Sequence, residues 1–178
     1  MTHLLHLYDA PPALAAHAAA FLRAGLDGGE AVLAFPTQAM AQRLSAALAD
    51  ARRHPRLLVM EAEAVLARMA GPGGIDPAHA MRFLQDLLDV AAPQGNGTVR
   101  VFSQLEAPLR GRGQARAAAA LEQAWNRLAE RNTFLLLCAY PQGAPQAAAA
   151  SRAALDCMLL HQGVLATEAA ASTAAAEA

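Results

Sequence analysis

The sequence predicts an α/β domain of three layers, in which a mostly parallel sheet of about five strands carries helices on both faces. Short apolar segments alternate with longer amphipathic ones along the chain, which is the pattern of strands joined by helical crossovers. The segment 134–138, FLLLC, is apolar throughout, as expected for a central strand covered on both faces. The segment before it repeats Leu121, Trp125 and Leu128 at helical spacing, which predicts a packed helix.

The remaining strands are predicted from apolar runs bounded by turn residues. Proline cannot donate to a strand ladder, so Pro141 ends the last of them. The five expected strands span residues 3–8, 31–35, 57–60, 99–102 and the run that begins at 134 and ends at 139–141.

Helices are predicted between these strands from start signals and apolar spacing. Asp9, Thr37 and Asp76 each stand where a helix cap is expected, and prolines follow Asp9 and Asp76 in the first turn. We expect 71–74 to be a glycine-rich spacer and 108–113 to be a connection. The expected helices cover about 11–26, 36–48, 76–91 and 146–160, with a short one around Val65, Leu66 and Met69 and another that carries Leu121, Trp125 and Leu128.

Length and composition favour a single domain. A chain of 178 residues can bury a sufficient core without disulfides or metals, and we expect the domain to span 1–165, with 166–178 as an alanine-rich tail. Hydrophobic residues make up 55% but aromatic residues only 4%, so the expected core is aliphatic with a few aromatic anchors. The net charge is −1, and no Lys/Arg run exceeds Arg52-Arg53, so direct binding to nucleic acid is not expected.

The cysteines and the chain ends favour the cytoplasm. Cys138 and Cys157 lack the spacing of metal ligands and are expected to be reduced. We find no pattern of a signal peptide or a membrane helix.

The candidate site is predicted at the carboxyl ends of the strands, where open parallel sheets bind ligands. Hydroxyl and amide groups dominate there, which suits a small neutral or weakly polar organic ligand, with Gln104 at the mouth of the site. The alternative is that these residues only cap helices and finish strands. The strand-end candidates are Tyr8, Thr37, Gln38, Ser103, Gln104 and Tyr140.

Two further candidates lie on the predicted helix with Trp125. Glu122 and Asn126 border its apolar stripe, so they either face the site or brace a neighbouring loop through backbone hydrogen bonds. His3 and His6 must point to opposite faces of their strand. Because no His/Cys cluster has ligand spacing, we expect neither a metal nor another cofactor.

Several motifs together resemble those of the MEDS domain, the sensory domain of methanogens, methylotrophs and the dichloromethane dehalogenase repressor. The first strand has the form H-x-x-x-x-Y, with His3 and Tyr8, and the helix after it ends in G-L-x-x-G-E at 25–30. The chain then shows L-E-x-x-W-N-x-L at 121–128 and L-L-C-A-Y-P at 136–141. The resemblance covers most of the chain and adds weight to His3 and His161, whose counterparts recur in the family.

The resemblance implies a sheet of the RecA and KaiC type without its phosphate loop. The turn after Phe35 reads FPTQAMAQR and lacks the glycines and lysine that cradle phosphates, so we expect no ATP hydrolysis. The family has F-G-E-M where this chain has Phe102, Ser103, Gln104 and Leu105. Loss of that carboxylate puts in doubt any family activity that needs an acid or base there.

The predicted function is a non-catalytic sensory module that binds a small organic ligand and signals through a separate protein or a homo-oligomer. In the family such a domain is often joined to a DNA-binding or kinase segment, whereas this sequence stops soon after its last expected helix. The alternative is a ligand-free interaction module derived from a RecA-like ATPase. An enzyme is disfavoured because no nucleophile and base pair, phosphate loop or metal cluster is recognisable.

Overall fold

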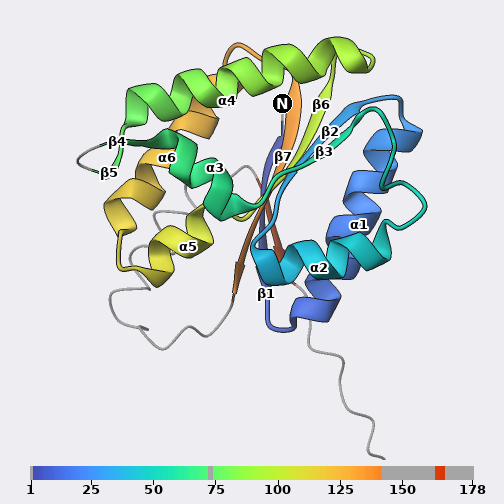
Figure 1. Cartoon of the computed structure of the whole chain (residues 1–178), viewed down its shortest axis with the longest axis horizontal. Helices are drawn as coiled ribbons and strands as arrows, with labels where there is room; N and C mark the ends of the chain where they lie inside the picture. Colours follow the sequence, from blue (N-terminus) through green and yellow to red (C-terminus); the bar gives the residue numbers. More distant parts are fainter. Residues whose placement is uncertain (1, 72–73, 142–162, 167–178) are drawn as a thin grey trace, which may run out of the picture.

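The structure, a computed structural model, describes residues 2–71, 74–141 and 163–166. Its main sheet has six parallel strands in the order β3-β2-β6-β7-β1-β8 (Figure 1), which confirms the predicted fold class. The strands are β1 (Thr2–Tyr8), β2 (Ala31–Phe35), β3 (Leu57–Val59), β6 (Val99–Ser103), β7 (Phe134–Pro141) and β8 (Gly163–Ala166).

The edge strand β8 was not predicted from the sequence. Its four residues, GVLA, precede an alanine-rich segment, so no turn residue marks where the strand ends. It pairs with β1, which places β1 inside the sheet. The helix expected over 146–160 lies outside the described residues.

Five of the expected helices are present, and one additional short helix interrupts a segment expected to be a connection. The long helices are α1 (Pro11–Asp27), α2 (Gln38–Ala47), α3 (Ala62–Met69), α4 (Pro77–Ala91) and α6 (Ala115–Ala129). The short α5 (Glu106–Gly111) contains Pro108 and ends at a glycine, so its sequence signals favoured a loop. Two short strands, β4 (Ala70–Gly71) and β5 (Gly74–Ile75), overlap the ends of the expected spacer and pair antiparallel.

The three expected caps behave differently. The Asp76 side chain accepts a hydrogen bond from the Ala78 amide at 3.0 Å and caps α4. The residue before α1 is Ala10, so Asp9 is not its cap. Thr37 precedes α2 but makes no side-chain cap bond, and its hydroxyl points elsewhere, as described below.

Alternating strand residues build two separate cores. Val32 and Ala34 pack with α1 and α2, whereas Leu33 and Phe35 pack on the opposite face with α3, α4, α5 and α6. Figure 1 shows these two groups of helices on the two sides of the sheet. Burial on both faces explains why β2 is apolar at every position.

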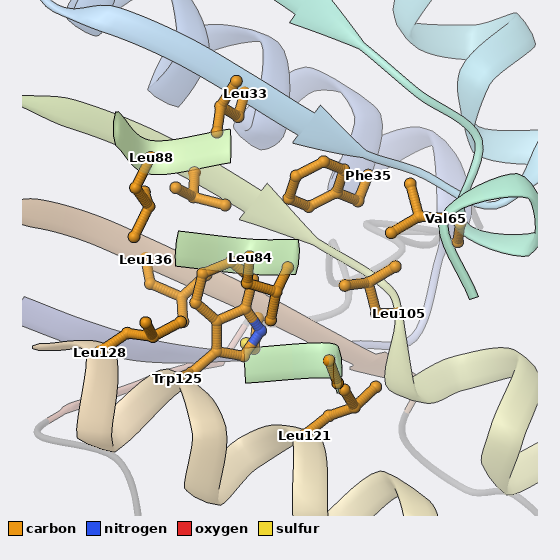
Figure 2. Packing of buried hydrophobic residues seen from close by; sticks show 14 of the residues in the cluster. Leu33, Phe35, Val65, Leu84, Leu88, Leu105, Leu121, Trp125, Leu128 and Leu136 are labelled. Atoms are coloured by element: carbon orange, nitrogen blue, oxygen red, sulfur yellow. The ribbon is translucent and has the colours of Figure 1, made fainter. Parts of the chain in front are cut away.

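Trp125 of α6 is the largest side chain in the core on the α6 side of the sheet. It is 0% exposed, and its ring centroid lies 6.4 Å from that of Phe35 and 5.8 Å from that of Phe134. Figure 2 shows it between Leu121, Leu128 and the sheet residue Leu136. The predicted inward stripe of α6 is therefore confirmed.

The G-L-x-x-G-E motif packs the end of α1 against β6. A Cβ on Gly25 would lie 2.8 Å from Cδ of Arg100 and 3.0 Å from Cγ2 of Val32, so a larger residue would force these side chains to shift. Arg100 then holds the Glu30 carboxylate through two hydrogen bonds of 2.6 and 2.9 Å. Gly29 has φ +78°, which favours glycine at this turn.

Within the described residues, we find no helix that combines the length and the apolarity needed to cross a membrane.

Candidate functional site

A buried polar cluster lies between β1, β7 and α6, on the sheet face that Trp125 covers. The His3 Nδ1 atom lies 2.9 Å from Asn126 Oδ1. On its other side, His3 Nε2 lies 3.3 Å from Cys138 Sγ and 3.5 Å from Glu122 Oε2. His3, Glu122 and Cys138 are each 0% exposed. This arrangement is called the His3 cluster below.

Tyr140 extends the His3 cluster toward the carboxyl end of β7. Its hydroxyl donates a hydrogen bond to Glu122 Oε1, so the two oxygens of this carboxylate face different neighbours. The Arg110 guanidinium of α5 lies 5.1 Å from the centroid of the Tyr140 ring, within the usual range for a cation–π contact.

The sequence pattern explains how these residues meet. His3, Cys138 and Tyr140 occupy alternate positions that face α6, because side chains alternate along parallel neighbouring strands. Glu122 and Asn126 are one helical turn apart and border the Trp125 stripe, as predicted. In the structure, Glu122 and Asn126 contact the side chains of Tyr140 and His3. The bracing alternative predicted hydrogen bonds to the backbone of a loop instead.

A second group, called the Gln104 group here, joins the ends of three strands. The Gln104 side-chain oxygen accepts hydrogen bonds from the Thr37 amide at 3.1 Å and the Thr37 hydroxyl at 3.3 Å. Tyr8 at the end of β1 also hydrogen-bonds to Gln104, and burial raises the pKa of its phenol more than this bond lowers it. The group thus connects β1, β2 and β6.

A carboxyl group lies next to the Gln104 group despite the departure from the F-G-E-M pattern. Glu106 is 1% exposed, and burial raises its pKa to about 7, opposed by its own backbone amide, by Arg110 and by Ser103. The Ser103 hydroxyl donates to Glu106 Oε2 at 3.5 Å. Among the described residues, Glu106 Oε1 has no hydrogen-bond partner.

The predicted site residues therefore divide between two groups. Of the candidates, the His3 cluster contains His3, Glu122, Asn126 and Tyr140, and the Gln104 group contains Tyr8, Thr37 and Gln104. Ser103 binds Glu106, Gln38 is exposed, and His161 lies outside the described residues.

Two expectations differ from the structure. Gln104, which was expected at the mouth of a site, is only 2% exposed, because its amide bridges the β2 and β6 ends instead of facing solvent. His3 and Cys138 lacked ligand spacing in the sequence, yet one ligand atom from each of His3, Glu122 and Cys138 lies within 4.8 Å of the others. Parallel pairing of β1 with β7 supplies the proximity that spacing along the chain did not reveal.

Sequence reasoning missed Glu106, Arg110 and the polar surroundings of Cys138. The signal for Glu106 was the Ser-x-x-Glu spacing with Ser103, which is typical of a helix start. The proline and glycines of 108–113 predict a connection instead, and they outweigh this signal. Arg110 belongs to the same short helix.

His6 and His17 form a separate contact on the other face of the sheet. Their rings stack with centroids 5.3 Å apart, and burial, followed by the charge of His17, lowers the pKa of His6. The prediction that His3 and His6 point to opposite faces is confirmed.

A shallow hollow of about 200 Å³ lies between α4 and α6. Its lining includes Met81, Gln85 and Leu128, and neither the His3 cluster nor the Gln104 group contributes to it. The hollow therefore does not mark the strand-end site.

Comparison with known proteins identifies the family. The model of the MEDS family, described as the methanogen/methylotroph, DcmR sensory domain, matches residues 2–162. No curated protein matches the chain with significance. The match includes every described residue of both polar groups, and the chain belongs to the MEDS family of sensory domains.

Proposed function

We propose that this protein is a non-catalytic sensory module that binds a small, weakly polar organic ligand at the carboxyl ends of its strands and passes the signal to a protein partner. The observation that carries this proposal is the Gln104 group. Hydroxyl, amide and phenol groups from Tyr8, Thr37 and Gln104 converge there from three strand ends. Such a set can orient an uncharged ligand by hydrogen bonds.

The neighbouring Glu106 adds hydrogen-bonding capacity. Its pKa of about 7 means that the carboxyl group is neutral in a large part of the molecules at neutral pH. A neutral carboxyl donates as well as accepts, which suits a ligand hydroxyl or carbonyl group. The ligand would act by binding one conformation of the strand-end loops more tightly than another.

The proposal is tested first by native mass spectrometry of the protein as purified, and then by thermal unfolding with a panel of small alcohols and amides. We expect a member of the panel to raise the unfolding temperature of the wild type. Gln104→Ala should abolish that shift, whereas Gln123→Ala, at an exposed position on α6, should keep it. A shift that both variants retain would disprove a site at Gln104.

The alternative, a ligand-free interaction module, is favoured by a different observation. Gln104 already binds Thr37 within the chain, so the strand ends are partly satisfied without a ligand. In addition, the edge strand β3 exposes Leu58 by 43% and Val59 by 44%, which offers an apolar contact for a protein partner.

The same mass spectra separate the two functions. A bound small molecule on a monomer favours the sensor. For the alternative, we expect a ligand-free dimer or larger assembly that dissociates in Leu58→Ser, where the apolar contact is lost. An assembly unaffected by Leu58→Ser would exclude β3 as its interface.

A further inference from the structure

We propose that His3, Glu122 and Cys138 bind one divalent transition-metal ion of the Zn²⁺ type. Imidazole, carboxylate and thiolate are the three side-chain types that Zn²⁺ uses in proteins. All three side chains are fully buried and come from three packed elements, β1, α6 and β7. This inference does not depend on the organic ligand proposed above.

The separations fit a shared metal. In a tetrahedral zinc site, metal–ligand bonds of about 2.0 to 2.3 Å place neighbouring ligand atoms about 3.3 to 3.6 Å apart. His3 Nε2 lies 3.5 Å from Glu122 Oε2 and 3.3 Å from Cys138 Sγ. The third distance, between the Glu122 oxygen and Cys138 Sγ, is at most 4.8 Å. A small side-chain adjustment is enough to shorten it to the value of a shared metal site.

Two neighbouring side chains orient the ligands. Asn126 Oδ1 can only accept, so His3 Nδ1 carries the proton and Nε2 presents its lone pair to the centre of the cluster. Tyr140 binds Oε1 of Glu122, which directs Oε2 toward His3. Metal-binding histidines and carboxylates are characteristically held by such outer hydrogen bonds.

Charge also favours a divalent ion. Binding displaces the proton of the Cys138 thiol to solvent, so that a thiolate and the Glu122 carboxylate supply two negative charges. With neutral His3, these balance the two positive charges, and the buried site carries no net charge, which limits the cost of burial. The thiolate and imidazole select Zn²⁺ or Co²⁺ over Mg²⁺ and Ca²⁺. The fourth position remains for water or another donor.

The competing explanation is a metal-independent contact in which a protonated His3 ring pairs with Glu122. To distinguish the two, the full chain is purified and analysed for metal, stripped with a chelator, and titrated with Zn²⁺ and with Co²⁺. We expect about one ion per chain, and a thiolate-to-cobalt charge-transfer absorption in the near ultraviolet.

Matched variants assign the ligands. Cys138→Ser should remove the charge-transfer absorption, and Cys157→Ser, at the other cysteine, should keep it. Glu122→Gln should weaken binding strongly, and Glu130→Gln at the end of the same helix should leave it unchanged. Asn126→Ala should weaken Zn²⁺ binding by roughly 10- to 100-fold, as expected for loss of an outer hydrogen bond.

The proposal can be tested even if a variant fails to fold, because metal binding by the wild-type protein is measured separately. A wild-type protein that takes up less than about 0.1 ion per chain at excess Co²⁺ would overturn the site. So would a charge-transfer absorption that persists in Cys138→Ser.

Discussion

The imidazole Nε2 of His3 lies 3.3 Å from the Sγ of Cys138, although 135 positions separate the two residues in the chain. The contact exists because β1 and β7 are neighbours in the sheet, with Leu5 opposite Cys138. It places the thiol inside the protein, where it is 0% exposed, and not at a surface.

Cys138 is therefore expected to react slowly with thiol reagents. Reaction requires local or global opening of the sheet, since reagent cannot reach a fully buried sulfur. In Cys157→Ser, where Cys138 is the remaining thiol, labelling by an aromatic disulfide should be at least about 100-fold slower in buffer than in denaturant. Equal rates would show that β7 is not a central strand.

Trp125→Ala is expected to destabilise the protein by about 3 to 5 kcal/mol, because it removes a fully buried aromatic ring and leaves a cavity. That is a large part of the roughly 5 to 15 kcal/mol that stabilises a domain. Urea unfolding measures the loss directly. Val90→Ala, at a side chain that is 70% exposed, should change stability by less than about 0.5 kcal/mol. Similar losses in both variants would contradict the inward face of α6.

The pH dependence of stability should reveal Glu106. Burial raises its pKa from 4.5 to about 7 in the folded protein, so the unfolded chain loses the proton first as pH rises. The free energy of unfolding is therefore unaffected below about pH 4.5 and falls as pH rises from 4.5 to 7. Above pH 7 the full loss is on the order of 3 kcal/mol.

The glutamine in Glu106→Gln cannot ionise, so this variant should not lose stability as pH rises through this range. Relative to the wild type, it should be of similar stability at pH 4 and more stable by on the order of 2 to 3 kcal/mol at pH 8. Chemical unfolding at several pH values measures the difference. Glu61→Gln, at an exposed position, serves as the control. If the two variants show the same pH profile, Glu106 is not buried as described.

The fold was predictable because its strongest signals are local. The run at 134–138 and the stripe of Leu121, Trp125 and Leu128 depend on neighbouring residues alone, and both have the predicted structures. The six-residue α5 was not predicted, because Pro108 and Gly111 are typical of a loop and the helix is too short to show an apolar stripe.

The candidate site was predictable only as a set of positions. Strand ends and helix borders predict Gln104 and Glu122 as candidates. Which candidates lie together depends on the strand order, which residue spacing does not reveal. His3 and Cys138 meet only because the first and last long strands of the sheet are paired. The burial of Glu106 depends on α5, and so it was missed together with that helix.

The final prediction concerns Gly95, which follows η1 (Ala92–Gln94) and lies against the turn between α1 and β2. A Cβ on Gly95 would lie 2.5 Å from the Ala31 amide nitrogen and 2.7 Å from the Gly29 carbonyl oxygen. These are backbone atoms and cannot rotate away. The amide of the next residue, Asn96, donates to Gly29 O at 2.9 Å, which holds the two segments together.

Gly95→Ala should therefore destabilise the protein by about 1 to 3 kcal/mol, as forced overpacking does. Gly111→Ala is the matched control, because a Cβ there meets nothing within 4 Å and alanine is the better helix former. Thermal unfolding should show a lower midpoint for Gly95→Ala and an unchanged or higher one for Gly111→Ala. Gly95 lies four residues before β6, in the connection from α4. Equal midpoints in the two variants would mean that this connection does not pack against the turn between α1 and β2.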